Sequence, residues 1–106
     1  MPVYNNETGT NLAGAAGAIV GSTGADLASA DTIIVTDTHH TVTGAAVINT
    51  IDAQNALRQG SLLFLRCPAG ATWTLGVAGN IKKAVVPAVG ESVALDYDGT
   101  NFWPVR

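Results

Sequence analysis

The feature that most restricts the fold is a series of short apolar runs, rich in β-branched residues, that begins at Asp31. Gly, Pro, Asn and Asp separate the runs, so each run predicts one short strand. The runs read TIIVT, HTVTG, AAVINTI, SLLFLRC, ATWTLGV, KKAVVPAV, ESVALDY and NFWPV. Seven or eight short strands at this spacing are typical of an antiparallel β-sandwich or barrel. We therefore expect an all-β, jelly-roll-like domain over residues 31–106.

The apolar pattern inside these runs predicts which side chains share a face of the sheet. In AAVINTI, the alternation places Val47, Asn49 and Ile51 on one face. In ATWTLGV, it places Trp73 and Leu75 together and the threonines opposite. SLLFLRC is apolar at nearly every position and does not alternate, which predicts a strand that is central in its sheet or covered on both faces. KKAVVPAV contains a proline, which cannot donate to a ladder, and is expected at an edge or as a broken strand.

The pair Asp98-Gly99, between the last two runs, is the strongest turn signal in the chain. It predicts a β-hairpin, because Asp-Gly suits the left-handed backbone that a tight two-residue turn requires. Phe102 and Trp103 then lie on the returning strand rather than on a loose tail. We expect the Trp103 ring to pack in the core of the closing hairpin.

Residues 1–30 have a different composition, in which Ala and Gly dominate and no large apolar residue recurs with a period. A helix over residues 13–20 is poorly supported, because Gly14 and Gly17 each cost about 1 kcal/mol relative to Ala. We interpret residues 1–30 as an extended arm that orders on another protein, for example by strand addition. The first residues lack the basic and apolar regions of a signal peptide, and no early run is apolar enough to span a bilayer.

Length and charge restrict the partners of the chain. Its 106 residues are enough for one domain with a modest core. Charged residues make up 12% of the chain, about half the usual share, and the net charge is −3 with no basic block. This argues against nucleic acid, which is bound through clustered Lys and Arg. Two explanations of the low charge stay open: a surface covered by other protein, or a polar, uncharged surface.

Two groups of residues are candidates for a metal or catalytic site. Asp37, His39 and His40 stand close together and could ligate a metal or form a base. Adjacent residues of a strand point to opposite faces, so a polar turn is the preferred interpretation. One of the histidines could still meet its copies on a threefold axis. Cys67 follows an apolar strand and precedes a proline, where a small buried residue is expected rather than a nucleophile.

Asp96 and Asp98 resemble half of a calcium loop, but the residues that follow are not those of such a loop, and a hairpin turn is preferred. The glycines form no phosphate-binding loop, and no serine stands in a nucleophile elbow. We therefore expect no catalytic, cofactor or metal residue, and a protein that is not an enzyme.

Part of the chain resembles the small β domains of tailed-bacteriophage virion proteins. The resemblance covers about 75 residues, the C-terminal three-quarters of the chain, and the motifs that carry it lie between INTI and the C-terminal NFWPV. The matching positions are Gly60, residues 62–65, Gly79, Asn80, Ile81, Gly90, Val93, Leu95, Tyr97, Asp98, Gly99 and Trp103. Such domains occur at the tips of tail fibres and spikes and as decoration (cement) proteins on capsids, and they are commonly trimeric.

The resemblance implies a structural virion protein. One short domain with an arm favours a capsid decoration protein, a homotrimer that binds the major capsid protein on the outer capsid surface and stabilises the shell. It would be made in the host cytoplasm and would bind neither nucleic acid nor membrane. The alternative is a receptor- or carbohydrate-binding domain of a tail fibre or spike, for which the candidate sugar-binding aromatics are Trp73, Phe102 and Trp103.

Overall fold

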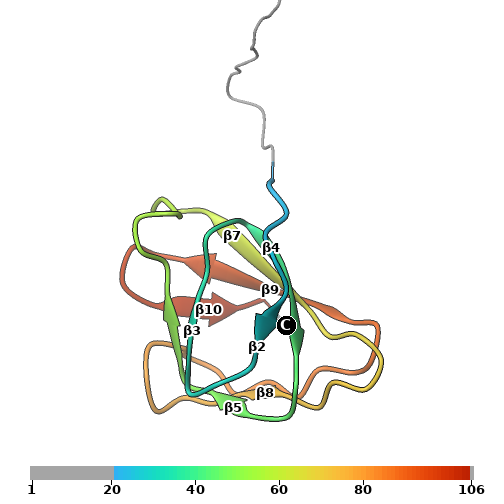
Figure 1. Cartoon of the computed structure of the whole chain (residues 1–106). Helices are drawn as coiled ribbons and strands as arrows, with labels where there is room; N and C mark the ends of the chain where they lie inside the picture. The colour runs from blue at the N-terminus through green and yellow to red at the C-terminus, as the bar shows by residue number, and fades with distance from the viewer. Residues whose placement is uncertain (1–20, 106) are drawn as a thin grey trace, which may run out of the picture.

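The computed structural model of the chain describes residues 21–105, which form nine strands and no helix (Figure 1). It follows that none of these residues belongs to a helix that could cross a membrane. The strands are β2 (Leu27–Ala28), β3 (Thr32–Ile34), β4 (His39–Thr43), β5 (Val47–Ile48), β6 (Thr50–Asp52), β7 (Leu62–Arg66), β8 (Thr74–Leu75), β9 (Ser92–Tyr97) and β10 (Phe102–Pro104). The predicted all-β class is confirmed for this part of the chain.

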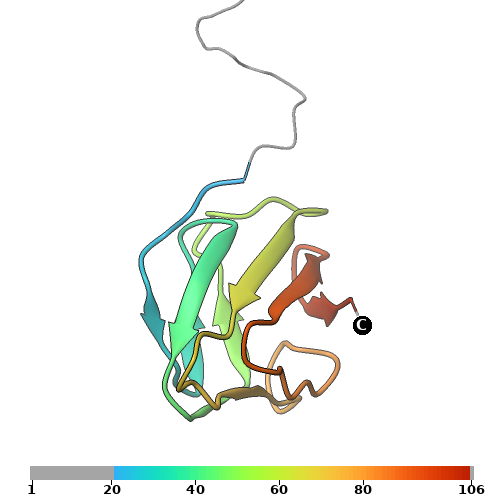
Figure 2. The ribbon, with the colours of Figure 1, turned by 90° about the vertical axis from the view of Figure 1, so that its right-hand side faces the viewer.

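The chain winds through three successive turns that stack on one another. The first turn contains β2 and β3, the second contains β4, β5 and β6, and the third contains β7 and β8. Strands at the same place in neighbouring turns pair in parallel: β2 with β4, β4 with β7, β3 with β6, and β5 with β8. Figure 1 looks along this winding, and Figure 2 shows its turns side by side.

A C-terminal hairpin covers one end of the winding. β9 runs antiparallel beside β7, and β10 runs antiparallel beside β9, which completes a five-stranded sheet in the order β10-β9-β7-β4-β2. The predicted Asp98-Gly99 turn is confirmed, with the Asp98 N–H donating to the Asn101 carbonyl at 3.1 Å. Gly99 has a φ of 97°, a left-handed conformation that side-chain-bearing residues rarely adopt.

The expected antiparallel pairing holds only for this hairpin and for β7 with β9. The other four ladders between described strands are parallel, so the antiparallel prediction is wrong for them. The physical reason is that a parallel partner is reached only after a long connection. Here, one full turn of the winding supplies that connection, and a run pairs with a run of the following turn.

The domain also starts earlier than residue 31. Residues 21–30, which composition assigns to the arm, lie along β4: Leu27 pairs with Val42, and the Ser29 N–H donates to the Thr43 carbonyl at 2.8 Å. The rest of the predicted arm, with the weakly supported helix at 13–20, lies outside the described residues.

The core is a stack of apolar residues from consecutive turns. Ile33 lies beside Ile51 and Ile48 beside Leu75 in their ladders, and all four are at most 3% exposed. Each such side chain contributes about 1.5–3 kcal/mol by leaving water. Trp73 is 1% exposed, and its Nε1–H donates to the Val42 carbonyl at 2.8 Å. The predicted shared face of Trp73 and Leu75 is therefore confirmed.

The alternation predicted for AAVINTI is wrong, because the chain turns a corner at Asn49, between β5 and β6. Ile48 and Ile51 are both buried, while Val47 is 50% exposed. The Asn49 side chain holds the corner by donating to the Asp31 carboxylate at 2.9 Å. Gly79 passes so close to it that a Cβ there would collide with the Asn49 backbone, so only glycine fits.

Candidate functional site

The side of the five-stranded sheet that faces away from the core carries an unusual number of apolar side chains. We call this surface the outer sheet face; it turns toward the viewer in Figure 2. It consists of His39, Leu62, Phe64, Arg66, Ala94, Asp96, Trp103 and Val105. Side chains of a strand alternate between its two faces, so every second residue of β7 and β9 points away from the core and contributes to this surface.

Strand register brings these side chains into rows. Asp96 of β9 lies between Leu62 of β7 and Trp103 of β10, and Ala94 lies beside Phe64 in the next row. Leu62 is 43% exposed and Trp103 is 48% exposed. Val105, in the row of Ala94, is 59% exposed. Three large apolar side chains this exposed on one face of a small domain mark a candidate interaction surface.

The position of Trp103 differs from the sequence prediction. Its ring is exposed, whereas the neighbouring Phe102 is fully buried and stacks on Tyr97 with ring centroids 4.5 Å apart. Consecutive residues of β10 point to opposite faces, so only one of the two aromatics can enter the core. The Trp103 indole N–H donates to the Asp98 carboxylate at 2.8 Å, which fixes the ring beside the hairpin turn.

The Asp98 carboxylate is used within the hairpin. It accepts hydrogen bonds from the backbone N–H of Asn101 at 2.7 Å and of Thr100 at 2.8 Å, besides that of the Trp103 indole. These donors, the Asn101 backbone first, then the Trp103 indole and the Thr100 backbone, hold the pKa of Asp98 below its ordinary value. No three His, Cys, Asp or Glu side chains among residues 21–105 gather closely enough to hold a metal ion.

The two histidines point to opposite faces of β4, as the alternation predicts. His40 is fully buried: its Nδ1 lies 2.8 Å from the Ala25 carbonyl, and its Nε2 accepts from the backbone N–H groups of Thr36 and Asp37. This network assigns the proton of the neutral ring to Nδ1, since two donors already point at Nε2. His40 therefore ties residues 21–30 to the domain.

His39, on the outer side of β4, stacks on Phe64 with ring centroids 4.7 Å apart, and its Nδ1 lies 2.8 Å from the Thr38 hydroxyl. Asp37, the third residue of the candidate metal site, hydrogen-bonds to the hydroxyls of Ser22 and Thr36, which lower its pKa. Cys67 is buried as predicted, and its thiol donates to the Ala71 carbonyl at 3.6 Å. The structure does not bring these side chains together as one site.

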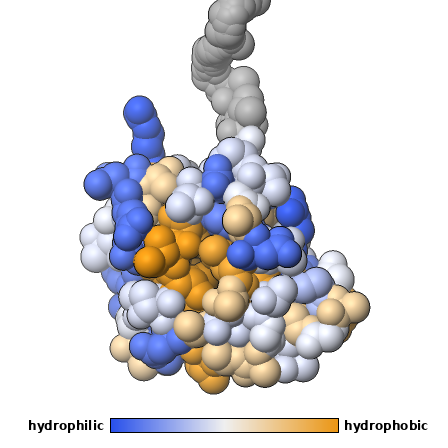
Figure 3. All heavy atoms as spheres, in the orientation of Figure 1, coloured by the Kyte–Doolittle hydropathy of each residue, from blue (hydrophilic) through white to orange (hydrophobic). Residues whose placement is uncertain are grey.

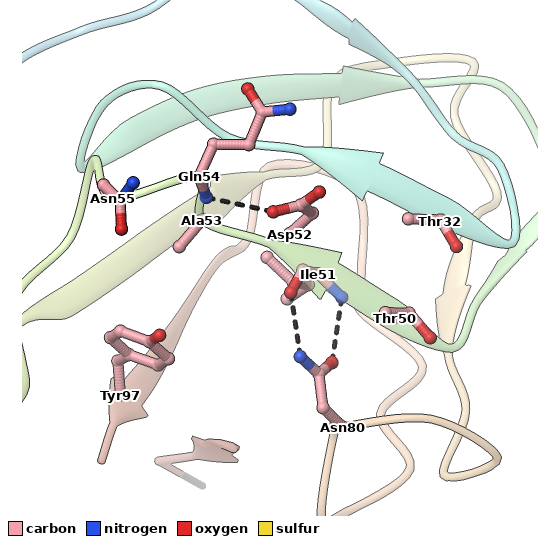
Figure 4. Close-up of a pocket in the computed structure, with 9 residues that line it drawn as sticks. All are labelled: Thr32, Thr50, Ile51, Asp52, Ala53, Gln54, Asn55, Asn80 and Tyr97. Carbon is pink, nitrogen blue, oxygen red and sulfur yellow. Dashed lines mark hydrogen bonds between the residues drawn. The ribbon is translucent and has the colours of Figure 1, made fainter. Parts of the chain in front are cut away.

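A shallow polar hollow of about 450 Å³ lies on another wall of the molecule (Figure 4). Its lining residues come from β3, β6, the loop after β6, Asn80 and Tyr97. Within residues 21–105, Gln54 and Asn55 are the residues other than glycine with positive φ, 44° and 67°. Sequence reasoning missed this hollow, since nothing in the run DAQNALRQG predicts the left-handed conformation of these two residues.

Asn80 forms the floor of the hollow, where its side chain replaces a strand. The Asn80 amide donates to the Ile51 carbonyl at 2.8 Å and accepts from the Ile51 N–H at 2.9 Å, the two bonds dashed in Figure 4. The amide thus extends the β3–β6 ladder by one peptide-like group. Each residue of the motif Gly79-Asn80-Ile81 thus has a structural role. Gly79 allows the close approach to the Asn49 backbone, Asn80 extends the ladder, and the Ile81 side chain is fully buried in the core.

The candidate sugar-binding aromatics do not meet at this hollow. Trp73 and Phe102 are in the core, and Trp103 lies on the outer sheet face. Tyr97 is the aromatic residue that lines the hollow. A further apolar patch lies on the open end of the winding, between β2 and β3, where Figure 3 shows orange residues with a hydrophilic rim. Leu27 and Ile34 contribute to this end of the molecule.

Comparison with known proteins gives no relative for this chain: no family model, no curated protein and no solved structure matches it. Its function has to be inferred from its own residues and their geometry.

Proposed function

We propose that the chain is a structural virion protein of a tailed phage, a capsid decoration protein that binds the major capsid shell as a homotrimer. The observation that carries the proposal is the outer sheet face, which is characteristic of a domain that acts within an assembly of protein copies. The run SLLFLRC forms the central strand of the sheet, as one of its two predicted placements requires, and its Leu62 stays 43% exposed at the surface. Trp103 and Val105 of the same face are also about half exposed, at 48% and 59%. Apolar and aromatic groups with few charges are characteristic of the centre of a protein interface.

In this proposal, the protein stabilises the shell by mass action. A ligand that binds the assembled shell but not its loose subunits stabilises the shell by RT ln(1 + [L]/Kd) per site. The β domain supplies a rigid unit, which we regard as a small sandwich-like module with an N-terminal arm. The arm is proposed to contact a neighbouring capsid subunit. The resemblance of the C-terminal three-quarters of the chain to phage virion domains supports the choice of partner.

Two measurements test this function. Mass-spectrometric counting on purified particles should find many copies per capsid. Co-sedimentation with undecorated capsids should carry the full chain down, and a chain without residues 1–20 should stay folded and bind more weakly. Absence of the full chain from capsid pellets would contradict the proposal.

A second candidate is the receptor- or carbohydrate-binding domain of a tail fibre or spike, which the polar hollow favours. Thr32, Thr50, Asp52, Gln54 and Asn55 present hydroxyl, carboxylate and amide groups around it, as a ligand rich in hydroxyl groups requires. A copy number of a few per particle, located at the tail, would select this function over decoration.

A further inference from the structure

The outer sheet face carries two charges of opposite sign at opposite ends of its strands. Asp96 lies in the row with Leu62 and Trp103, while Arg66 lies four residues further along β7. At about 3.3 Å per residue, the two rows are roughly 13 Å apart. Neither side chain has a hydrogen-bond or ion-pair partner among residues 21–105.

The apolar part of the face fills the space between the two charges. Phe64 and Ala94 occupy the middle row together with the His39 ring, which stacks on Phe64, and Leu62 and Trp103 flank the carboxylate. A partner with a uniform charge would meet attraction at one end of the face and repulsion at the other. A partner with the same two charges in reverse order would satisfy both ends and cover the apolar middle.

We propose that the partner of this face is a second copy of the chain, with its strands reversed. A twofold axis that crosses the strands near Phe64 exchanges the two charged rows. Asp96 of each copy then faces Arg66 of the other, with the apolar middle rows packed between them. Such a contact closes a pair of copies rather than a ring of three. It therefore goes beyond the proposed homotrimer, whose threefold contact would use another surface.

Charge reversal tests the contact, because reversing one partner produces like charges and reversing both restores the pair. Asp96→Arg and Arg66→Asp are each expected to weaken self-association at least tenfold, as measured by sedimentation velocity of the full chain without capsids. The double variant should self-associate again. Thermal unfolding of each variant checks that it is folded.

Mixing the two single variants provides a more stringent test of the contact. When unlike variants meet, the two introduced side chains face each other with opposite charges, and so do the two unchanged ones. An equimolar mixture should therefore recover pairs that neither variant forms alone. The matched control, Arg58→Asp, reverses an exposed charge elsewhere and should leave self-association unchanged.

Failure of this contact and failure of the proposed function give different results. If both single variants self-associate like the unmodified chain, or the mixture recovers nothing, the contact is wrong, whatever the protein binds. If the variants behave as expected but no form of the chain co-sediments with capsids, the contact stands and the capsid function is wrong.

Discussion

Both faces of the five-stranded sheet carry large apolar side chains, yet residues 21–105 cover only one of the two faces. On the inner face, Leu63 and Leu95 are fully buried. On the outer face, Leu62 and Trp103 are 43% and 48% exposed, although strands of the same sheet carry them. One continuous apolar run can therefore specify two surfaces. The inner surface stabilises the fold, and the outer surface is available to another molecule.

The largest expected loss of stability is in the core, at the buried Trp73. Trp73→Ala removes a buried ring and leaves the Val42 carbonyl without its donor. We expect a loss of about 3–5 kcal/mol in the free energy of unfolding, measured by urea denaturation. A loss below about 1 kcal/mol would show that the core does not depend on this ring.

The second largest loss of stability is expected at Asn80, whose side chain bonds to the backbone of β6. Asn80→Ala leaves the Ile51 N–H and carbonyl without partners, which should cost about 1–3 kcal/mol in the free energy of unfolding. Gln59→Ala is the matched control, because that amide is exposed, makes no side-chain hydrogen bond in the described part of the chain and does not have a left-handed backbone. Equal losses in the two variants would contradict the ladder role of Asn80.

A smaller loss of stability is expected on the outer sheet face, at Trp103. Trp103→Ala should change the free energy of unfolding by at most about 1 kcal/mol, since the ring is half exposed and makes one hydrogen bond. The same change should weaken self-association, which sedimentation velocity measures. A loss of stability as large as that of Trp73→Ala would show that the inner and outer faces do not differ as described.

The smallest effect concerns the hairpin that presents Trp103, and it depends on pH. The folded-state pKa of Asp98 is lowered by its hydrogen bonds, so its contribution is present above the unfolded-state value of about 3.9. That contribution is lost as the pH falls through the lower, folded-state pKa. Asp98→Asn should therefore flatten the decline of the melting temperature below about pH 4. Asp26→Asn, an exposed aspartate outside the hairpin, serves as control; an unaltered decline in Asp98→Asn would contradict the prediction.

Local features of the fold could be predicted from the sequence, but the winding could not. The Asp98-Gly99 turn and the buried pair Trp73 and Leu75 follow from turn chemistry and alternation. The parallel ladders join runs that are separated by other strands, and no local pattern names such a partner. The corner at Asn49 also interrupts an alternation that the sequence alone presents as one strand.

Part of the candidate surface could also be predicted from the sequence. The run SLLFLRC predicts a strand that is central or covered on both faces, and β7 is indeed central in its sheet. Within residues 21–105, only its inner side chains, such as Leu63 and Leu65, are fully buried. Alternation requires Phe102 and Trp103 to face opposite ways, but only the register of the hairpin decides which of the two enters the core. The placement of Asp96 and Arg66 on one face cannot be read from the sequence, because it depends on the pairing of β7 with β9.

The chain contains two tryptophans, Trp73 in the core and Trp103 on the outer sheet face. Fluorescence quenching therefore tests directly whether a second copy covers the outer sheet face. Trp73 is 1% exposed and Trp103 is 48% exposed, so acrylamide should quench mainly Trp103 in the dilute, dissociated protein. As the concentration rises and light scattering reports assembly, the quenching of Trp103 should fall, because the outer sheet face becomes covered by a second copy. Assembly with undiminished quenching of Trp103 would contradict the account.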